Sequence, residues 1–185
     1  MLPRSKVLGI GRNYADHAAE MGNEVPAEPL VFLKPNTSVI GPGDPIVVPA
    51  SRAPDVHFEG ELAVVIGRIC RDVPRGRRST GDLRLHRRQR RHRARPAAAA
   101  TASGRGPRAS TRSARWGRGS RPTSTPRDAA ITTTLGGETK QDGRTSDMLV
   151  DVPDLVAYVS SFMTLLPGDV ILTGTPDGVG PMLRR

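Results

Sequence analysis

The stretch VHFEGELAVVIG (residues 56–67) carries the clearest strand signal of the chain, together with two acidic residues. Val, Ile and Phe favour extended backbone and Gly67 ends the run, so we predict a strand over residues 58–67. Glu59 and Glu61 are two residues apart, which places both carboxylates on one face of that strand. Two like charges this close repel each other unless a cation lies between them, and oxygen ligands suit Mg²⁺ or Mn²⁺. The alternative is a solvated strand face, and the metal interpretation needs a third ligand.

Patterned sequence lies on both sides of this strand. β-branched and aliphatic runs bounded by Gly and Pro predict further strands, and the pair Gly136–Gly137 predicts a tight turn. Asn13 is predicted as the N-cap of a short helix, and apolar residues at helical spacing predict a second helix that begins near Pro153. The apolar face of this second helix is predicted to contain Leu155, Val156, Val159, Phe162 and Met163. The predicted strands are 6–11, 29–35, 58–67, 131–135 and 170–174, residues 41–49 are predicted to form a turn and a strand, and the predicted helices are 13–21 and 154–166.

His17 and Glu20 are three residues apart on the first predicted helix and therefore lie on one face. A carboxylate beside an imidazole orients the ring and raises its pKa, which suits a general acid or base. The alternative is a surface pair near the start of a helix, and the spacing alone favours this second interpretation.

The loop GTPDGVGP (residues 174–181) follows the last predicted strand. Its backbone N–H groups, with the hydroxyls of Thr173 and Thr175, can hold a carboxylate, and structural glycines are the alternative. The loop lacks the Gly-Lys-Ser/Thr ending of a phosphate-binding P-loop, so nucleotide binding is not indicated. Arg12 and Lys34 are candidate anion contacts or ordinary surface charges.

The net charge of +10 comes from one block of the chain. Residues 75–127 contain 17 of the 28 basic residues, all of them Arg, and one acid, Asp82, whereas the rest of the chain contains 11 basic and 17 acidic residues. The block has too few large apolar side chains to offset the entropy of ordering, so we predict that residues 75–128 are disordered. Its charge favours an alternative function, non-specific nucleic-acid binding, although Trp116 is its only aromatic residue for base stacking.

The sequence gives no reason to place the protein outside the cytoplasm. Cys70 is the single cysteine and cannot form an internal disulfide. The N-terminal residues have no apolar region of signal-peptide length, and no segment is long enough to span a bilayer. We therefore expect a cytoplasmic protein that has no membrane partner.

Five motifs, in their order along the chain, resemble the fumarylacetoacetate hydrolase family, and most closely its acylpyruvase and 2-hydroxyhepta-2,4-diene-1,7-dioate isomerase branch. They are GIGRNYADHAAEM, PLVFLKPNTSVIGPGD, VHFEGELAVVIG, QDGRTSDM and SFMTLLPGDVILTGTPDGVGP, and the resemblance covers residues 5–74 and about 129–182. It implies an α+β, mainly β fold, the mixed β-roll of the family's C-terminal domain. It also implies a Mg²⁺- or Mn²⁺-dependent enzyme of the kind met in aromatic catabolism. The substrates of such an enzyme are 2-oxo or enol carboxylic acids, and the reaction is C–C bond hydrolysis, decarboxylation or isomerisation. Family members commonly form dimers, so a homodimer is a further expectation.

The resemblance assigns roles to seven residues of this chain. The implied metal ligands are Glu59 and Glu61, the implied pair that activates water on a lid helix is His17 and Glu20, and the implied substrate contacts are Thr175 at the carboxylate, with Arg12 and Lys34 at the pocket edge.

The family's third metal ligand, an Asp, falls in the Arg-rich block. A permitted back-translation of residues 84–96, read one base later, encodes Gly-Tyr-Thr-Val-Ala-Asn-Asp-Val-Thr-Ala-Arg-Asp, the family motif that carries this ligand. A permitted back-translation of residues 101–111, read two bases later, encodes Gly-Gln-Trp-Ala-Arg-Ala-Lys-Gly-Phe-Asp, the next family motif with its pocket lysine. We therefore interpret the block as a product of shifted reading frames. Arg90 then replaces the third carboxylate, and a fixed cation in that place repels a divalent ion.

These inferences predict a chain in three parts. Residues 1–74 form the N-terminal part of the β-roll with its lid helix, residues 75–128 form the disordered basic segment, and residues 129–185 form the C-terminal part. We expect the roll to be truncated, because the chain ends at MLRR before a further strand that the family usually has. Since the third metal ligand is missing, we expect a member of the enzyme family without turnover.

Overall fold

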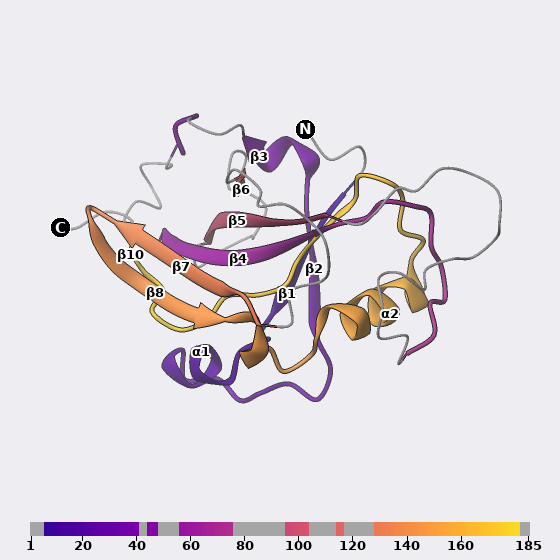
Figure 1. The fold of residues 1–185 in the computed structure, drawn as a ribbon, viewed down its shortest axis with the longest axis horizontal. Helices are drawn as coiled ribbons and strands as arrows, with labels where there is room; N and C mark the ends of the chain where they lie inside the picture. The colour runs from indigo at the N-terminus through magenta and orange to yellow at the C-terminus, as the bar shows by residue number, and fades with distance from the viewer. Residues whose placement is uncertain are drawn as a thin grey trace.

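The computed structural model describes residues 6–40, 44–47, 56–75, 95–103, 114–116 and 128–181, which form a mixed sheet, a separate hairpin and two α-helices (Figure 1). The strands of the main sheet follow the order β2-β1-β9-β4-β5-β6-β3, and β10 also pairs with β4. These strands are β1 (Val7–Gly11), β2 (Leu30–Lys34), β3 (Val39–Ile40), β4 (His57–Val65), β5 (Arg95–Ser103), β6 (Ala114–Trp116), β9 (Val170–Leu172) and β10 (Gly180–Pro181). The hairpin contains β7 (Ala130–Leu135) and β8 (Glu138–Arg144). The helices are α1 (Ala15–Glu20) and α2 (Val152–Phe162), with 3₁₀ turns η1 (Asn36–Ser38) and η3 (Thr145–Asp147).

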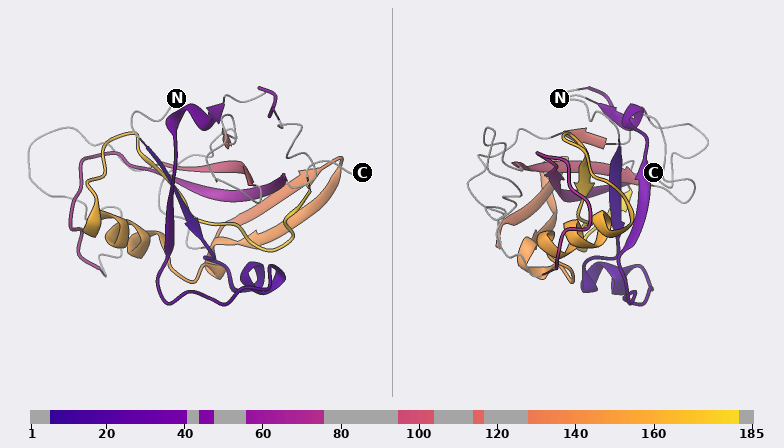
Figure 2. Two further views of the ribbon diagram at one scale, coloured as in Figure 1. Left: turned by 180° about the vertical axis from the view of Figure 1, so that it is seen from behind. Right: turned by 90° about the vertical axis from the view of Figure 1, so that its right-hand side faces the viewer.

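The centre of the main sheet is formed by β1, β9 and β4. β1 and β9 are parallel, whereas β4 is antiparallel to β9. Because successive side chains of a strand point to opposite faces, these strands contribute to two cores. One core packs the sheet against α2 (Figure 2) and includes Leu8, Ile10, Leu62, Val64, Leu155, Val159 and Ile171. The other contains Val7, Val39, Ala63, Val170 and Leu172. The predicted fold class, α+β and mainly β with a mixed sheet, is confirmed.

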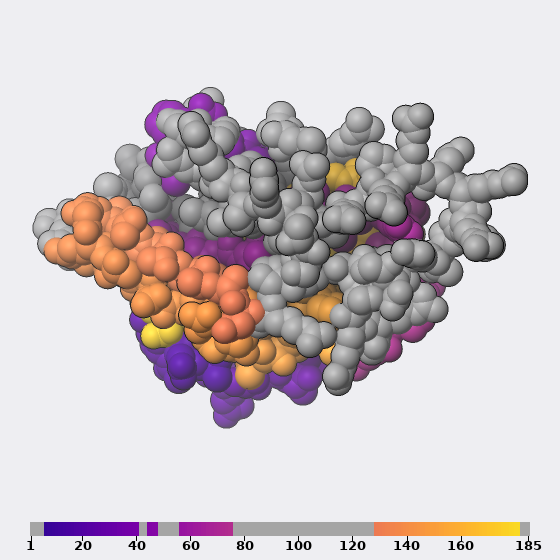
Figure 3. Space-filling view, in the orientation of Figure 1, coloured from indigo at the N-terminus to yellow at the C-terminus, as the bar shows by residue number. Residues whose placement is uncertain are grey.

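The β7–β8 hairpin packs on β4 at a glycine. A Cβ at Gly60 would lie 2.2 Å from Thr133 Oγ1, so only glycine allows the hairpin to approach this closely. Gly136 and Gly137 connect the two strands with φ values of 62° and 85°, which confirms the predicted tight turn. In the space-filling view the hairpin follows the surface of the molecule, next to N-terminal residues coloured indigo (Figure 3).

Helix α2 begins as the sequence predicts. Pro153 lies in its first turn, and Asp151 is the N-cap, whose carboxylate accepts a hydrogen bond from Asp154 N at 3.0 Å. Of the predicted apolar face, Leu155, Val156 and Val159 are buried and Met163 packs at the edge of the core. The prediction is wrong for Phe162, which is 47% exposed because it ends the helix and packs edge-on against Tyr158.

Replacing Asp151 by Ala should destabilise the fold by about 1 kcal/mol, because the change leaves an N–H group of the first helical turn without its acceptor. The midpoint of urea unfolding measures this loss. Asp151→Asn is the matched control and should cost only a few tenths of a kcal/mol, since its amide oxygen can accept the same hydrogen bond. Equal losses in the two variants would show that charge, and not the cap, is responsible.

Two local predictions are wrong. Helix α1 begins at Ala15 with Tyr14 as its N-cap, so Asn13 does not cap it. The amide of Asn13 is instead buried, where it donates to Val150 O at 3.0 Å and Thr173 O at 2.9 Å and accepts from Val150 N at 2.9 Å. The strand predicted over residues 41–49 is absent from its described part, residues 44–47, because Pro45 removes a ladder donor there.

The segment predicted to be disordered contains two strands among its described residues. β5 pairs with β4 along nine residues, and β6 pairs with both β5 and β3. Backbone hydrogen bonds can form such a ladder without large apolar side chains. Arg90 and most of the Arg-rich run lie outside the described residues, so the disorder, the division of the chain into three parts and nucleic-acid binding stay predictions. In the described part of the chain, neither α-helix has the length and apolar character needed to cross a bilayer.

Candidate functional site

Residues 173–178, called here the glycine-rich loop, follow β9. They make hydrogen bonds both to β4, which carries Glu61, and to Glu20 of α1. At its start, the backbone N–H and the hydroxyl of Thr173 both donate to Leu62 O of β4, each at 3.0 Å. Gly174 N donates to Glu61 Oε2 at 2.9 Å. Gly178 N lies 3.2 Å from each carboxylate oxygen of Glu20. The loop therefore positions one carboxylate from β4 and one from α1.

Glu59 and Glu61 occupy alternate positions of β4, as predicted. Glu61 is buried, with 6% of its surface exposed, and Glu59 is half-buried. Gly60 lies between them and faces the β7–β8 hairpin, so the two glutamates are on the opposite face of the strand. The hydrogen bond from Gly174 N holds the Glu61 carboxylate against the start of the glycine-rich loop.

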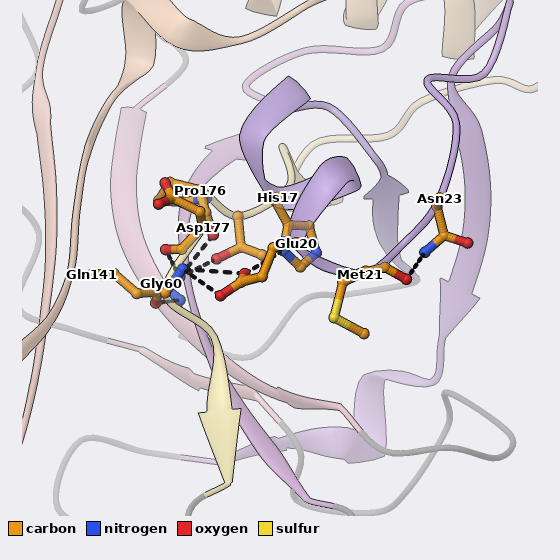
Figure 4. A network of polar contacts seen from close by, with 10 residues as sticks. His17, Glu20, Met21, Asn23, Gly60, Gln141, Pro176 and Asp177 are labelled. Atoms are coloured by element: carbon orange, nitrogen blue, oxygen red, sulfur yellow. Dashed lines mark hydrogen bonds and ion pairs between the residues drawn. The ribbon is translucent and has the colours of Figure 1, made fainter.

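His17 and Glu20 form the predicted pair on α1. His17 Nδ1 lies 3.5 Å from Glu20 Oε2, longer than a normal hydrogen bond, and the His17 side chain is 15% exposed. Figure 4 shows the carboxylate of Glu20 directed toward the loop at Pro176 and Asp177. Glu20 therefore has two neighbours: the backbone N–H of Gly178, and the imidazole of His17, whose buried Nδ1 makes no hydrogen bond with the residues that the structure describes.

Gln141 makes hydrogen bonds both to β4 and to the glycine-rich loop, and we did not select it from the sequence. It lies in the middle of β8 with 1% of its surface exposed. Its Oε1 accepts from Gly60 N at 2.8 Å, and its Nε2 donates to Thr175 Oγ1 at 2.8 Å and to Pro176 O at 3.0 Å (Figure 4). One amide thus fastens the glycine-rich loop to β4.

Tyr14 is a second residue that the sequence did not indicate. It is 2% exposed, and its hydroxyl has no hydrogen-bond partner among the residues that the structure describes. Burial raises the pKa of the Tyr14 hydroxyl, and the nearby carboxylates of Asp147 and Glu61 raise it further. The phenol therefore keeps its proton and is a hydrogen-bond donor close to Glu61.

Arg12 and Lys34 are not positioned alike. Arg12 has a left-handed backbone with φ 58°, and its guanidinium donates to Asn23 Oδ1 at 2.8 Å and to Glu24 O at 3.4 Å. It therefore anchors the segment that follows α1. Lys34 is buried, 3% exposed, and lies opposite Val7 at the start of β1, away from the end at which α1 follows.

The described residues do not fit a divalent cation on their own. Among them, no group of three or more His, Cys, Asp or Glu side chains gathers in one place. The β5 residues paired with Glu59 and Glu61 are Thr101 and Ala99, and the whole of β5 contains no acidic residue, His or Cys. Glu59 and Glu61 alone therefore make an incomplete site, because Mg²⁺ held by one or two carboxylates needs waters and substrate oxygen atoms to complete its shell.

Comparisons with known proteins agree with this fold and its motifs. The model of the fumarylacetoacetate hydrolase C-terminal domain matches residues 6–185. A mitochondrial oxaloacetate tautomerase of Arabidopsis thaliana is 38% identical over 195 residues, which cover 96% of this chain and 82% of that protein. The crystal structure of 5-carboxymethyl-2-hydroxymuconate delta-isomerase from Mycobacterium smegmatis is 42% identical with a TM-score of 0.80, over 97% of this chain and 71% of that chain.

A further solved structure is fumarylpyruvate hydrolase from Pseudomonas aeruginosa in complex with Mn²⁺ and pyruvate. It is 29% identical with a TM-score of 0.81, and the match covers all of this chain and 88% of that chain. The family model covers nearly the whole sequence, and the described strands agree with the solved structures. The chain therefore belongs to the fumarylacetoacetate hydrolase family.

Proposed function

We propose that this chain comes from a Mg²⁺- or Mn²⁺-dependent enzyme that hydrolyses, decarboxylates or isomerises 2-oxo or enol carboxylic acids, and that the chain as written has lost this turnover. The observation that carries the proposal is the incomplete acidic cluster. Glu59 and Glu61 occupy β4, while β5, the strand beside them, contributes no acidic residue to the site. The names of the relatives support the substrate class, since they describe enzymes of small carboxylic acids, one of them bound to Mn²⁺ and pyruvate.

The remaining site residues can bind and orient such an acid. The carboxylate of Glu20 lies 3.5 Å from Nδ1 of His17, and in this proposal the imidazole is the base and the carboxylate its acidic neighbour. The hydroxyl of Thr175 supplies a donor for a carboxylate, whereas the N–H groups of Thr173, Gly174 and Gly178 already donate to protein acceptors. In this proposal the chain retains substrate contacts and a base but lacks the Lewis acid that would stabilise negative charge on an enolate.

The missing turnover follows from electrostatics. In the frame-shift interpretation, Arg90 stands in the sequence where the family motif has its third carboxylate, so one negative charge is replaced by a positive one. A divalent cation at Glu59 and Glu61 then has one carboxylate ligand fewer, and the added positive charge repels it. The affinity for Mg²⁺ or Mn²⁺ should therefore fall strongly.

The test measures cleavage of an acylpyruvate and tautomerisation of oxaloacetate by the purified chain, with and without Mg²⁺ or Mn²⁺. The expected result is no increase in rate when the metal is added. Metal-dependent turnover that Glu59→Ala abolishes would overturn the proposal. Glu138→Ala is the matched control, because it removes an acid from the solvent-exposed end of β8 and should change no rate.

A further inference from the structure

The buried amide of Gln141 has one possible orientation. Gly60 N can only donate a hydrogen bond, so the atom that faces it at 2.8 Å is the amide oxygen. The carbonyl oxygens of Pro176 and Asp177 can only accept, at 3.0 Å and 3.3 Å, so the atom that faces them is the amide nitrogen. Three backbone groups thus agree on one arrangement.

This arrangement decides what the Thr175 hydroxyl can do. Gln141 Nε2 donates to Thr175 Oγ1 at 2.8 Å, so the hydroxyl acts as acceptor in that contact and its own hydrogen stays unused. Thr175 is 5% exposed, and within the part of the chain that the structure describes no acceptor contacts this hydrogen. The Thr173 hydroxyl differs, because it donates to Leu62 O at 3.0 Å. Of the two loop threonines, only Thr175 keeps a donor for a ligand.

The same amide connects the loop to the strand that carries the acidic pair. Gly60 lies between Glu59 and Glu61, and its N–H is held by Gln141, while the other end of the amide holds residues 175–177. A carboxylate that binds to the loop is thereby held at a fixed distance from β4. Resting on the proposed substrate class, we propose that Gln141 is a positioning residue that holds Thr175 as a hydrogen-bond donor to the carboxylate of a bound 2-oxo acid.

The experiment titrates the metal-free chain with pyruvate in the presence of EDTA and follows the backbone amide signals of Gly174 and Gly178 by NMR. Gln141→Glu keeps the acceptor for Gly60 N but replaces the donor by an oxygen, so the Thr175 hydroxyl must turn and donate to it. The Kd for pyruvate should rise about 10- to 100-fold, the loss expected for one hydrogen bond to a charged group. Gln141→Met, which removes the amide without adding charge, should weaken binding in the same direction by a smaller factor.

Threonine variants separate a positioning role from a purely structural one. Thr175→Val should raise the Kd as much as Gln141→Glu does, and the double variant should lose little more, because both changes remove one donor. Thr175→Ser should keep the Kd within about twofold, because the serine hydroxyl provides the same donor.

Two results would overturn the inference: losses that multiply in the double variant, or a chain that does not bind pyruvate at high millimolar concentration. Losses that multiply would leave the proposed function unaffected, whereas a lack of pyruvate binding would also contradict the substrate contacts that it retains. The proposed loss of turnover fails only if metal-dependent turnover is found.

Discussion

A chain translated in the family's reading frame across residues 84–128 is expected to bind Mn²⁺ at least about a hundredfold more tightly than the chain as written. The frame-restored chain contains the Asn-Asp-Val motif in place of the run around Arg90, and under the proposal above this motif supplies the third carboxylate to Glu59 and Glu61. It also lacks the positive charge of Arg90, so under the same proposal an attractive charge replaces a repulsive one. The disappearance of the free Mn²⁺ signal in electron paramagnetic resonance titrations measures both affinities.

A variant of the frame-restored chain provides the control. Glu59→Gln keeps the shape of that side chain but removes a charged ligand, so the gained affinity should fall again by at least about tenfold. Sequencing of the gene across codons 75–128 tests the same interpretation independently. An uninterrupted frame that encodes the arginines, together with tight Mn²⁺ binding by the chain as written, would contradict the account of the site.

The central strands were predictable because their sequences satisfy local and tertiary requirements at once. In β1, β2 and β4, apolar or β-branched residues form short runs that end at Gly or Pro, and these strands indeed form the centre and edge of the main sheet. The carboxylates of Glu59 and Glu61 follow from the period of a strand, and the His17–Glu20 pair follows from that of a helix.

β8 could not be predicted, because ETKQDGR has no large apolar residue and no alternation that marks a buried face. What buries Gln141 is a set of polar partners that come from residues far away in the sequence. Asn13 is a second residue whose role depends on distant contacts that the local sequence does not reveal. Its residue type favours an N-cap, but its amide is needed by Val150 and Thr173, and the tertiary contacts prevail.

Gly178→Ala should destabilise the fold by about 2–4 kcal/mol, which corresponds to a fall in Tm of roughly 4–16 °C for a chain of this size. Gly178 has φ +83°, a conformation that costs an L-residue about 1–2 kcal/mol. A Cβ there would also lie 2.2 Å from Lys140 O, a backbone atom of β8 that cannot rotate away. The loop must therefore move, which breaks the contact of Gly178 N with Glu20 and strains the hydrogen bonds of Gln141.

Gly136→Ala is the control that separates the steric part of this loss from the backbone strain. Gly136 has a similar positive φ of +62°, but among the described residues, its two chain neighbours aside, no atom lies within 4 Å of the position its Cβ would take. Its replacement should therefore cost only the backbone strain, about 1 kcal/mol. Thermal unfolding of both variants measures the difference, and the excess loss at Gly178 is the cost of separating the glycine-rich loop from β8. If both variants lose the same stability, the loop does not pack on Lys140 as described, and the amide of Gln141 cannot hold Thr175 in place.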